Sequence, residues 1–273
     1  MLKPFLKWAG GKRWLINNGT LPQSIEFNKY YEPFLGSGAV FFFLQPQKAR
    51  LSDINPDLIE LYEVIRDEPK DFSELLNVHH KNHCKAYYYR IRSDVPGNRL
   101  DKAARLLYLN RTCWNGLYRV NTKGEFNVPI GTKTSVLLET DDFLTLSDVL
   151  NRVDLICSDF EESIDLAIAG DFLFIDPPYT VQHNNNNFLK YNENIFGWDD
   201  QVRLRNAIVR AKNRGVKALI TNADHPSIIE LYKGVGDYCQ LNRSSVLAGK
   251  KEKRGRTTEA MFLTNIQMGN KGE

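Results

Sequence analysis

The sequence of 273 residues is poor in cysteine and contains no long apolar run. Its four cysteines, Cys84, Cys113, Cys157 and Cys239, are scattered without a CxxC pair, which indicates neither a zinc site nor a disulfide framework. No stretch is long and apolar enough for a membrane span, and the opening MLKPFLKWAGGK is too short and too interrupted for a signal peptide. These absences predict a cytoplasmic protein that binds neither a membrane nor a metal.

A strong excess of one charge is also lacking. Lys and Arg number 36 and Asp and Glu 33, so the net charge of +3 is weak evidence for a nucleic-acid partner. Basic residues gather near positions 3–13, 102–133 and 249–256. The last run, GKKEKRGR, is typical of a solvated loop and becomes informative only if other evidence points to a polyanion.

Strand and helix patterns alternate at both ends of the chain. A strand is expected to enter YYEPFLGSGAVFFFL (30–44), and a second strand to end near Asp53. The next helix is expected to begin at Pro56, with Asn55 as its N-cap. The later elements are expected to be strands within 153–160 and 171–179, a helix at 199–215, and strands at 216–223 and 257–265.

The middle of the chain lacks this alternation, because residues 70–150 have helical and loop-rich patterns. We therefore predict an α/β fold with a parallel, doubly wound sheet and an inserted, mostly helical segment at 57–150. In such sheets ligands bind beyond the carboxyl ends of the strands. The candidate site residues considered next all follow predicted strands and so fall at such ends.

The first candidate site is the stretch EPFLGSG, which begins at Glu32. Gly36 and Gly38 would let a ligand approach the backbone closely. A dinucleotide fingerprint would have a third glycine where Phe41 stands, which argues against NAD or FAD. Taken alone, the pattern fits a tight strand–helix turn equally well.

Two acids also end predicted strands. Asp53 could accept hydrogen bonds from the hydroxyl pair of a ribose, and we favour this role over a cap for the Asn55–Pro56 helix. Asp159 could reach the exocyclic amine of an adenine, with Phe160 beside the ring. An acid in that position is as often a helix cap.

The most specific stretch is DFLFIDPPYT, residues 171–180. Proline has no backbone N–H to donate, so the strand is expected to end near Asp176. The Asp176 carboxylate and the Pro177 carbonyl are two acceptors that could bind both hydrogens of an exocyclic amine, and Tyr179 could stack on its ring. Such binding directs the nitrogen lone pair toward an electrophilic methyl group, so no cysteine nucleophile is needed.

Six stretches together resemble one family, the adenine-N6 DNA methyltransferases of the Dam type, or D12 class. They are FLKWAGGK (5–12), EPFLGSG (32–38), SDIN (52–55), LNRTCWNGLYRVN (109–121), GEFNVP (124–129) and DPPY (176–179), in the family's order. The resemblance covers almost the whole chain. It implies a site-specific, adenine-specific DNA methyltransferase with S-adenosyl-L-methionine as cofactor and double-stranded DNA as partner.

The resemblance also implies an architecture. A Rossmann-like, S-adenosylmethionine-dependent methyltransferase sheet is expected in a discontinuous catalytic domain, residues 1–56 and 151–273. A target-recognition domain is expected at 57–150, containing a β-hairpin. A monomer with a role in restriction–modification or in DNA methylation marking is expected.

Residue by residue, the resemblance assigns Trp8 and Lys12 to the cofactor, the alternatives being a core tryptophan and a solvated lysine. It places Asp53 at the ribose and Asp176 between the cofactor and the target adenine. The expected cofactor-binding residues are Trp8, Lys12, Glu32, Phe34, Gly36, Gly38, Asp53, Asp159, Phe160 and Asp176, and the expected catalytic residues are Asp176, Pro177 and Tyr179.

The stretch 114–119 resembles the family's hairpin loop that enters DNA. Trp114 and Leu117 could wedge into the base stack as an adenine leaves it, because the adenine N6 is paired inside the duplex. Asn115 could bond the orphaned thymine, and Arg119 could read a guanine through its N7 and O6.

Two more residues concern which sequence is read. Lys7 resembles a family lysine that helps to read the first guanine, and Pro129 resembles a proline that packs against a thymine methyl. Residues 131–133 are Gly-Thr-Lys where the family often has an arginine, so GATC is expected from the resemblance only. The basic run 249–256 is then expected to meet DNA phosphates.

Three alternatives were weighed. Enzymes that methylate an amine in RNA or an amide in protein more often carry Asn in place of Asp176, and they lack the motif at 109–121. A catalytically silent DNA-binding relative is opposed by intact Asp176, Asp53 and Gly36. A nicotinamide oxidoreductase is opposed by Phe41.

Overall fold

The computed structural model describes residues 2–17, 19, 21, 25–121, 123–182, 196–244 and 256–266. These residues form a mixed α/β fold with a seven-stranded sheet in the order β3-β2-β1-β4-β5-β7-β6. The strands are β1 (Tyr30–Glu32), β2 (Ala49–Asp53), β3 (Val153–Cys157), β4 (Phe172–Ile175), β5 (Lys217–Ala223), β6 (Asp237–Ser244) and β7 (Arg256–Thr264).

The helices follow the same order along the chain. They are α1 (Arg13–Asn17), α2 (Ala39–Leu44), α3 (Pro56–Asp67), α4 (Pro69–Asn82), α5 (Lys85–Ser93), α6 (Arg99–Thr112), the 3-10 helix η1 (Trp114–Gly116), α7 (Phe143–Leu150), α8 (Phe160–Leu166), α10 (Trp198–Asn213) and α11 (Pro226–Leu231). None of the helices in the described part of the chain has the length and apolarity that a membrane crossing needs.

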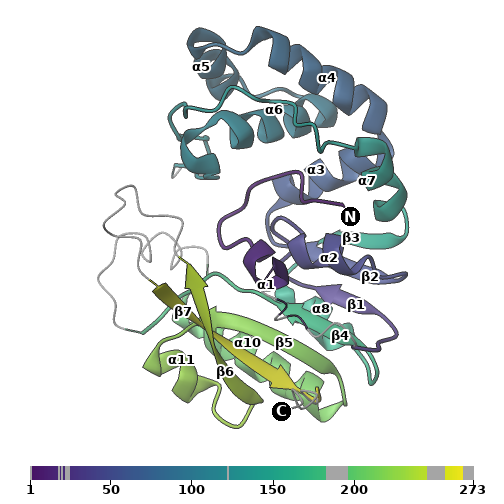
Figure 1. Ribbon diagram of the computed structural model, residues 1–273, viewed down its shortest axis with the longest axis vertical. Helices are drawn as coiled ribbons and strands as arrows, with labels where there is room; N and C mark the ends of the chain where they lie inside the picture. The colour runs from purple at the N-terminus through teal and green to yellow at the C-terminus, as the bar shows by residue number, and fades with distance from the viewer. Residues whose placement is uncertain are drawn as a thin grey trace. The chain divides into compact units, whose positions relative to one another are not determined.

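The sheet is parallel at its centre and antiparallel at one end. Strand β1 pairs in parallel with β2 and β4, and β4 pairs in parallel with β5. Strand β7 runs antiparallel to both β5 and β6, side by side with them in Figure 1. The prediction of a parallel sheet is therefore wrong at this end. Strand β6 was not expected, because an edge strand can stay polar: of positions 237–242, Leu241 is the one that is buried.

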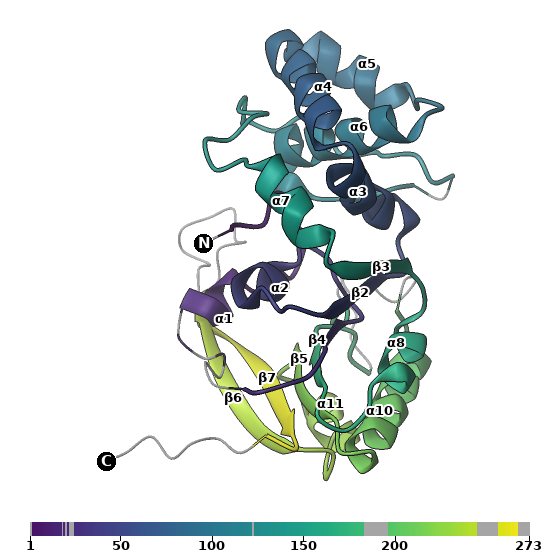
Figure 2. The same ribbon diagram turned by 90° about the vertical axis from the view of Figure 1, so that its right-hand side faces the viewer.

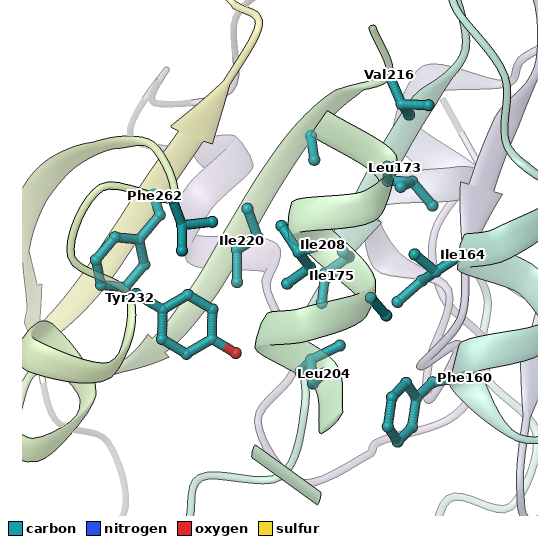
Figure 3. Packing of buried hydrophobic residues seen from close by; sticks show 14 of the residues in the cluster. Phe160, Ile164, Leu173, Ile175, Leu204, Ile208, Val216, Ile220, Tyr232 and Phe262 are labelled. Atoms are coloured by element: carbon teal, nitrogen blue, oxygen red, sulfur yellow. The ribbon is translucent and has the colours of Figure 1, made fainter. Parts of the chain in front are cut away.

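One compact unit consists of Trp14–Phe34, Lys48–Ser52 and Ser158–Glu273. Its core lies where α10 and α8 cover the strands. Figure 3 shows Leu204 and Ile208 of α10 beside Ile175 of β4 and Ile220 of β5, with Phe160 of α8 nearby. Each fully buried side chain of this size contributes about 1.5–3 kcal/mol relative to an exposed one. This packing fixes the strand ends from which the candidate residues extend.

Helices α8 and α10 lie next to each other in this unit (Figure 2). Their exposed faces are joined by Arg210, whose guanidinium pairs with Glu161 at 2.7 Å and with Asp165 at 2.8 Å. A helix at 199–215 was expected from sequence and α10 confirms it, with Gly215, at φ 86°, just past its end, whereas no helix was specified for the residues of α8. Exposed ion pairs of this kind stabilise a fold only slightly, so the apolar contacts dominate.

The other compact unit consists of Met1–Arg13, Leu35–Gln47 and Asp53–Cys157. Helices α3 to α7 make up most of it, with α6 at the centre (Figure 1). Every residue from Leu106 to Thr112 of α6 is buried, as is typical of a helix enclosed on all sides. The buried Arg111 guanidinium pairs with Asp141 and donates to the Phe5 carbonyl at 2.6 Å, which ties the N-terminal segment to α6.

The start of α3 confirms a prediction. The Asn55 side chain accepts hydrogen bonds from the backbone N–H groups of Asp57 (3.1 Å) and Leu58 (3.3 Å), and Pro56 is the first helical residue. A side-chain oxygen at the N-cap satisfies amides that have no partner within the helix. The cap therefore sets where β2 ends and α3 begins.

The predicted β-hairpin is not confirmed. Among the described residues of 113–130, two isolated antiparallel bridges pair Cys113 with Ile130 and Val120 with Phe126, and no named strand is present. Residues up to Thr112 belong to α6, and Trp114 begins the turn η1. The expected domain boundaries at 57 and 150 stay predictions.

Candidate functional site

The glycine-rich stretch after β1 makes a tight turn, and it lies within the unit that contains α3. Gly36 and Gly38 have φ angles of 48° and 61°, a region that favours glycine. A Cβ atom at Gly36 would lie 2.9 Å from Cδ1 of Trp8, so the backbone here touches the indole ring. The atoms that approach this backbone closely are those of the Trp8 ring, and the approach of a ligand stays a prediction.

Asp53 holds this turn. Its Oδ2 accepts a hydrogen bond from the Gly36 N–H at 3.1 Å, and its Oδ1 accepts one from the Asn55 N–H at 3.0 Å. Burial raises the pKa of Asp53, and the backbone N–H donors partly oppose that shift. Since Asn55 supplies the side-chain cap of α3, the alternative reading of Asp53 as that cap is wrong. A carboxylate can accept about four hydrogen bonds, and the two named here use half of that capacity.

Trp8 and Lys12 lie in the same unit. The Trp8 ring stacks on Tyr118, with ring centroids 5.1 Å apart and planes 27° from parallel. The Tyr118 hydroxyl donates to Asp57 Oδ2 at 3.0 Å. Lys12 is only 2% exposed and donates from Nζ to the Gly10 carbonyl at 2.8 Å, so the reading as a solvated lysine is wrong. A lysine side chain is almost never fully buried unless its ammonium group is paired with another group.

In the other unit, four further predicted residues fall near β1 and α8. Glu32 is buried and accepts a hydrogen bond from the Tyr30 hydroxyl at 2.8 Å. Phe34 stacks on Phe160, with ring centroids 5.3 Å apart. Asp159 is the N-cap of α8, which is one of the two readings that the sequence supported equally. Its proposed contact with an adenine stays a prediction.

The DPPY stretch leaves the sheet where the prolines require it. Strand β4 ends at Ile175, and Asp176 follows directly. The Asp176 Oδ1 accepts a hydrogen bond from the Thr221 hydroxyl of β5 at 2.8 Å. The carboxylate is therefore held by the neighbouring strand, and Pro177 is buried behind it.

Tyr179 is fixed by an acid that the sequence reasoning missed. Its hydroxyl donates to Oε2 of Glu259 at 2.7 Å, and Glu259 is 3% exposed. Burial raises the pKa of Tyr179 well above its usual range, with further contributions from the negative charges of Asp176 and Glu259. Tyr179 thus stays protonated and can donate at neutral pH. The available signal was an acid inside the apolar strand pattern TTEAMFLTN.

A buried amide pair also escaped prediction. Asn222 of β5 donates from Nδ2 to Oε1 of Gln201 on α10 at 3.0 Å, and neither residue is exposed. The Thr221 hydroxyl that holds Asp176 comes from the same strand. Buried polar pairs of this kind orient side chains uniquely when every group has a partner.

The residues expected to meet DNA lie together around η1 in the unit that contains α6. Trp114 is 52% exposed, and its backbone N–H donates to the carbonyl of exposed Pro129 at 2.9 Å. Asn115 is exposed and has a φ of 56°, a left-handed conformation that is uncommon in residues other than glycine. Arg119 is exposed and donates from Nε to Asn127 Oδ1 at 2.8 Å.

Two other predicted DNA contacts flank this turn. Leu117 is half-buried, and its carbonyl accepts from the Cys113 thiol at 3.3 Å. Lys7 is exposed at its head, and the aliphatic part of its side chain reaches the turn: a Cβ at Gly116 would lie 2.7 Å from Lys7 Cδ. The structure brings Lys7 and the turn together although they are far apart in sequence. The basic run at 249–255 lies outside the described residues.

Among the described residues, no group of three or more His, Cys, Asp or Glu side chains is arranged to hold a metal ion. The candidate groups are instead carboxylates, backbone amides and aromatic rings. Such groups can bind hydrogen-bonding ligands that carry flat rings.

Known proteins match this chain over most of its length. The D12 class N6 adenine-specific DNA methyltransferase family matches residues 8–245. Type II methyltransferase M1.LlaDCHI of Lactococcus lactis subsp. cremoris is 37% identical, over 97% of this chain and 95% of its own length. Type II methyltransferase M.MjaIII of Methanocaldococcus jannaschii is 35% identical, over 85% of this chain and 89% of its own length. The DNA adenine methylase of Escherichia coli K12 is 32% identical, over 85% and 84%. The family match and these relatives agree, and this chain belongs to the D12 class of N6 adenine-specific DNA methyltransferases.

Proposed function

We propose that the protein transfers a methyl group from S-adenosyl-L-methionine to N6 of an adenine that has left the stack of duplex DNA. The observation that carries this proposal is Asp176, which stands at the end of β4 and is held by the Thr221 hydroxyl. The DPPY stretch offers the two fixed acceptors that an exocyclic amine needs. The family and its named relatives support the adenine specificity.

Asp176 and Pro177 would act on the amine of the target base. The carboxylate of Asp176 accepts one N–H hydrogen and the carbonyl of Pro177 accepts the other. With both hydrogens bound, the nitrogen lone pair would project away from the protein acceptors, toward the incoming methyl carbon. The amine gives up one proton as it gains the methyl group, and the Asp176 carboxylate would accept that proton. Tyr179 would stack on the base, and its tether to Glu259 limits the rotation of the ring.

When bound, S-adenosyl-L-methionine supplies an electrophilic methyl group and leaves as S-adenosylhomocysteine. The residues fit such a cofactor in chemical type. In the unit that contains α3, the Gly36 backbone allows close approach, Gly38 shares the left-handed conformation, and Asp53 has the acceptors that a ribose requires. We assign Trp8 and the buried Lys12 to the same ligand.

In the other unit, we assign aromatic and acidic side chains to the cofactor as well. Phe34 and Phe160 form a stacked pair that suits an adenine ring, and Asp159 is beside it in sequence. Glu32 is the last residue of β1 and precedes Phe34 by two positions in the chain. These assignments are individual proposals, each open to substitution.

We further propose that residues 57–150 recognise the DNA, and that residues 1–56 and 151–273 carry out catalysis, in a cytoplasmic, monomeric enzyme. Trp114 and Leu117 would fill the space of the departing adenine, and Asn115 would bond its former partner. Arg119, Lys7 and Pro129 would read flanking bases, with GATC as the expected site. We propose that the enzyme serves in restriction–modification or in marking DNA by methylation.

The direct test is methyl transfer from labelled S-adenosyl-L-methionine to unmethylated duplex DNA, with duplex and single-stranded RNA as parallel substrates. The expected product is N6-methyladenine in DNA, identified after nuclease digestion. Methylation-sensitive sequencing of a naive genome exposed to the enzyme then gives the recognised sequence. Transfer to RNA without transfer to DNA would overturn the proposal.

A further inference from the structure

Asn110 is a buried amide that connects two exposed segments. It lies on α6 and is 1% exposed. Its Nδ2 donates to the Lys7 carbonyl at 2.7 Å and to the Gly116 carbonyl at 3.2 Å, and its Oδ1 accepts from the Lys7 N–H at 3.0 Å. One side chain therefore bonds both backbone groups of Lys7 and the end of η1.

This pattern uses the donor and acceptor capacity of an asparagine almost fully. An asparagine amide has two N–H donors and one carbonyl acceptor, and here both kinds are engaged. No other residue type of the same size presents donors and an acceptor in one plane. Aspartate would lose both donors, and leucine would lose all three bonds.

The two connected segments also pack on each other. Gly116 has a φ of 65°. A Cβ at this position would lie 2.7 Å from Lys7 Cδ and 3.2 Å from the backbone carbonyl oxygen of Asn110. The stem of Lys7 thus lies against the turn that carries Trp114 and Asn115. A small movement of either segment would move the other.

What this assembly presents to solvent suits a polyanion with flat bases. Lys7, Trp114 and Asn115 are all exposed, whereas the amide that anchors them is buried. Burial and, after it, the positive charge of Lys133 lower the pKa of Lys7, so the charged form of Lys7 is partly disfavoured and the two charges repel. A phosphate or a base acceptor would relieve that repulsion.

We propose that Asn110 is a positioning residue for DNA recognition: it holds Lys7 and the turn Trp114–Gly116 at a fixed spacing, so that both meet the duplex in one register. The role rests on the proposed function, because it concerns the reading of DNA by an active methyltransferase. Asn110 itself is buried and does not touch the DNA.

The test compares Asn110→Ala and the isosteric Asn110→Asp with Asn98→Ala. Asn98 is a matched control: it is on the same helix, it caps α6 by accepting from the Asp101 N–H at 2.8 Å, and it is exposed. Its loss weakens α6 without touching Lys7. For each variant, kcat/KM is measured on the methylated site found by sequencing and on duplexes with one base changed, and the thermal midpoint is recorded.

We expect both Asn110 variants to lower the discrimination between the correct and changed sites about tenfold at one or two positions. At the base pairs where Lys7→Ala alone lowers discrimination, Lys7→Ala combined with Asn110→Ala should lower it no further, because there both changes act through Lys7. Asn98→Ala should lower the thermal midpoint and leave discrimination at the wild-type ratio. Asn110→Asp keeps the shape of the side chain but sets a buried carboxylate against the Lys7 and Gly116 carbonyls, so Asn110→Ala is the milder variant and keeps the comparison available if the aspartate variant does not fold.

Two kinds of failure are separable. If the wild-type protein methylates no DNA, the proposed function is wrong. If the wild type methylates DNA but the Asn110 variants keep wild-type discrimination and differ only in thermal midpoint, as Asn98→Ala does, Asn110 is structural and the positioning role is wrong. Additive losses for Lys7→Ala and Asn110→Ala would also contradict it.

Discussion

Removing one hydroxyl, in Tyr179→Phe, should test how the DPPY stretch is held. The substitution keeps the ring that would stack on a base and removes the donor to Glu259 Oε2, 2.7 Å away. Because Glu259 is 3% exposed, water does not readily replace the lost donor. The variant should therefore lose stability and should retain part of its methyl transfer.

The size of the loss follows from the chemistry of this bond. A hydrogen bond to a buried charged group contributes about 1.5–3 kcal/mol, which includes the penalty for a carboxylate left without that donor. In a chain of this size a loss of about 2 kcal/mol lowers the thermal midpoint by about 4–8 °C. Replacing both partners by apolar groups, as in Tyr179→Phe with Glu259→Leu, should cost less than the sum of the single changes.

The assay is urea and thermal unfolding of the two single variants and the double variant. Tyr238→Phe is the matched control, because the Tyr238 hydroxyl also donates to a carboxylate, Asp224 Oδ1 at 2.8 Å, but is 43% exposed. Its loss should stay below about 1 kcal/mol. Strictly additive losses for Tyr179 and Glu259, or equal losses at Tyr179 and Tyr238, would refute the reasoning.

The same pair predicts a pH dependence. Burial, then the charges of Asp176 and Glu259, raise the pKa of Tyr179 above its value in the unfolded chain, near 10. Its contribution to stability is therefore complete below about pH 10 and is lost as the pH rises through the folded-state pKa. The stability gap between wild type and Tyr179→Phe should be constant from pH 6 to about pH 9 and should narrow in stronger alkali.

Three further substitutions test the assigned residues. Asp176→Ala should abolish methyl transfer while DNA binding, measured by gel shift, largely survives; unchanged turnover would refute its placement at the target amine. Arg119→Ala should relax discrimination at one guanine by about 1–3 kcal/mol, and a uniform loss on all sequences would make it a phosphate contact instead. Gly36→Ala should cost about 1–2 kcal/mol for its φ of 48° and weaken cofactor binding in calorimetry, through the clash with Trp8. Gly97→Ala, where an added Cβ would meet nothing within 4 Å, is its control, and equal effects at both glycines would contradict the prediction.

Local chemistry made much of the fold predictable. Asn55 and Pro56 mark the start of α3 because a cap and an N1 proline act on the residues next to them, and the structure has both. The prolines after Asp176 likewise end β4. Strand β6 could not be found in this way, because an edge strand needs no apolar run. The direction of β7 depends on its pairing with β5 and β6, which no local pattern records.

In the candidate site, too, residues set by local chemistry were predictable, and residues set by contacts distant in sequence were not. Gly36 was predictable because a left-handed turn favours glycine whatever surrounds it. Thr221 and Glu259 were missed because their importance lies in partners 45 and 80 positions away, Asp176 and Tyr179. Asn110 was quoted within a motif, yet its three bonds to Lys7 and Gly116 come from the packing of α6 and not from any spacing in sequence.

The place of β7 in the sheet has a consequence for synthesis of the protein. Strand β7 is the last strand along the described chain, yet it lies between β5 and β6. During synthesis, β5 and β6 leave the ribosome before β7. Neither can form its hydrogen bonds with β7 until residues 256–264 have also emerged. Glu259 arrives with that strand, so the tether on Tyr179 forms at the same step. The nascent chain would thus acquire its anchored DPPY stretch only after residues 256–264 have been made, 80 positions beyond the tyrosine that they hold.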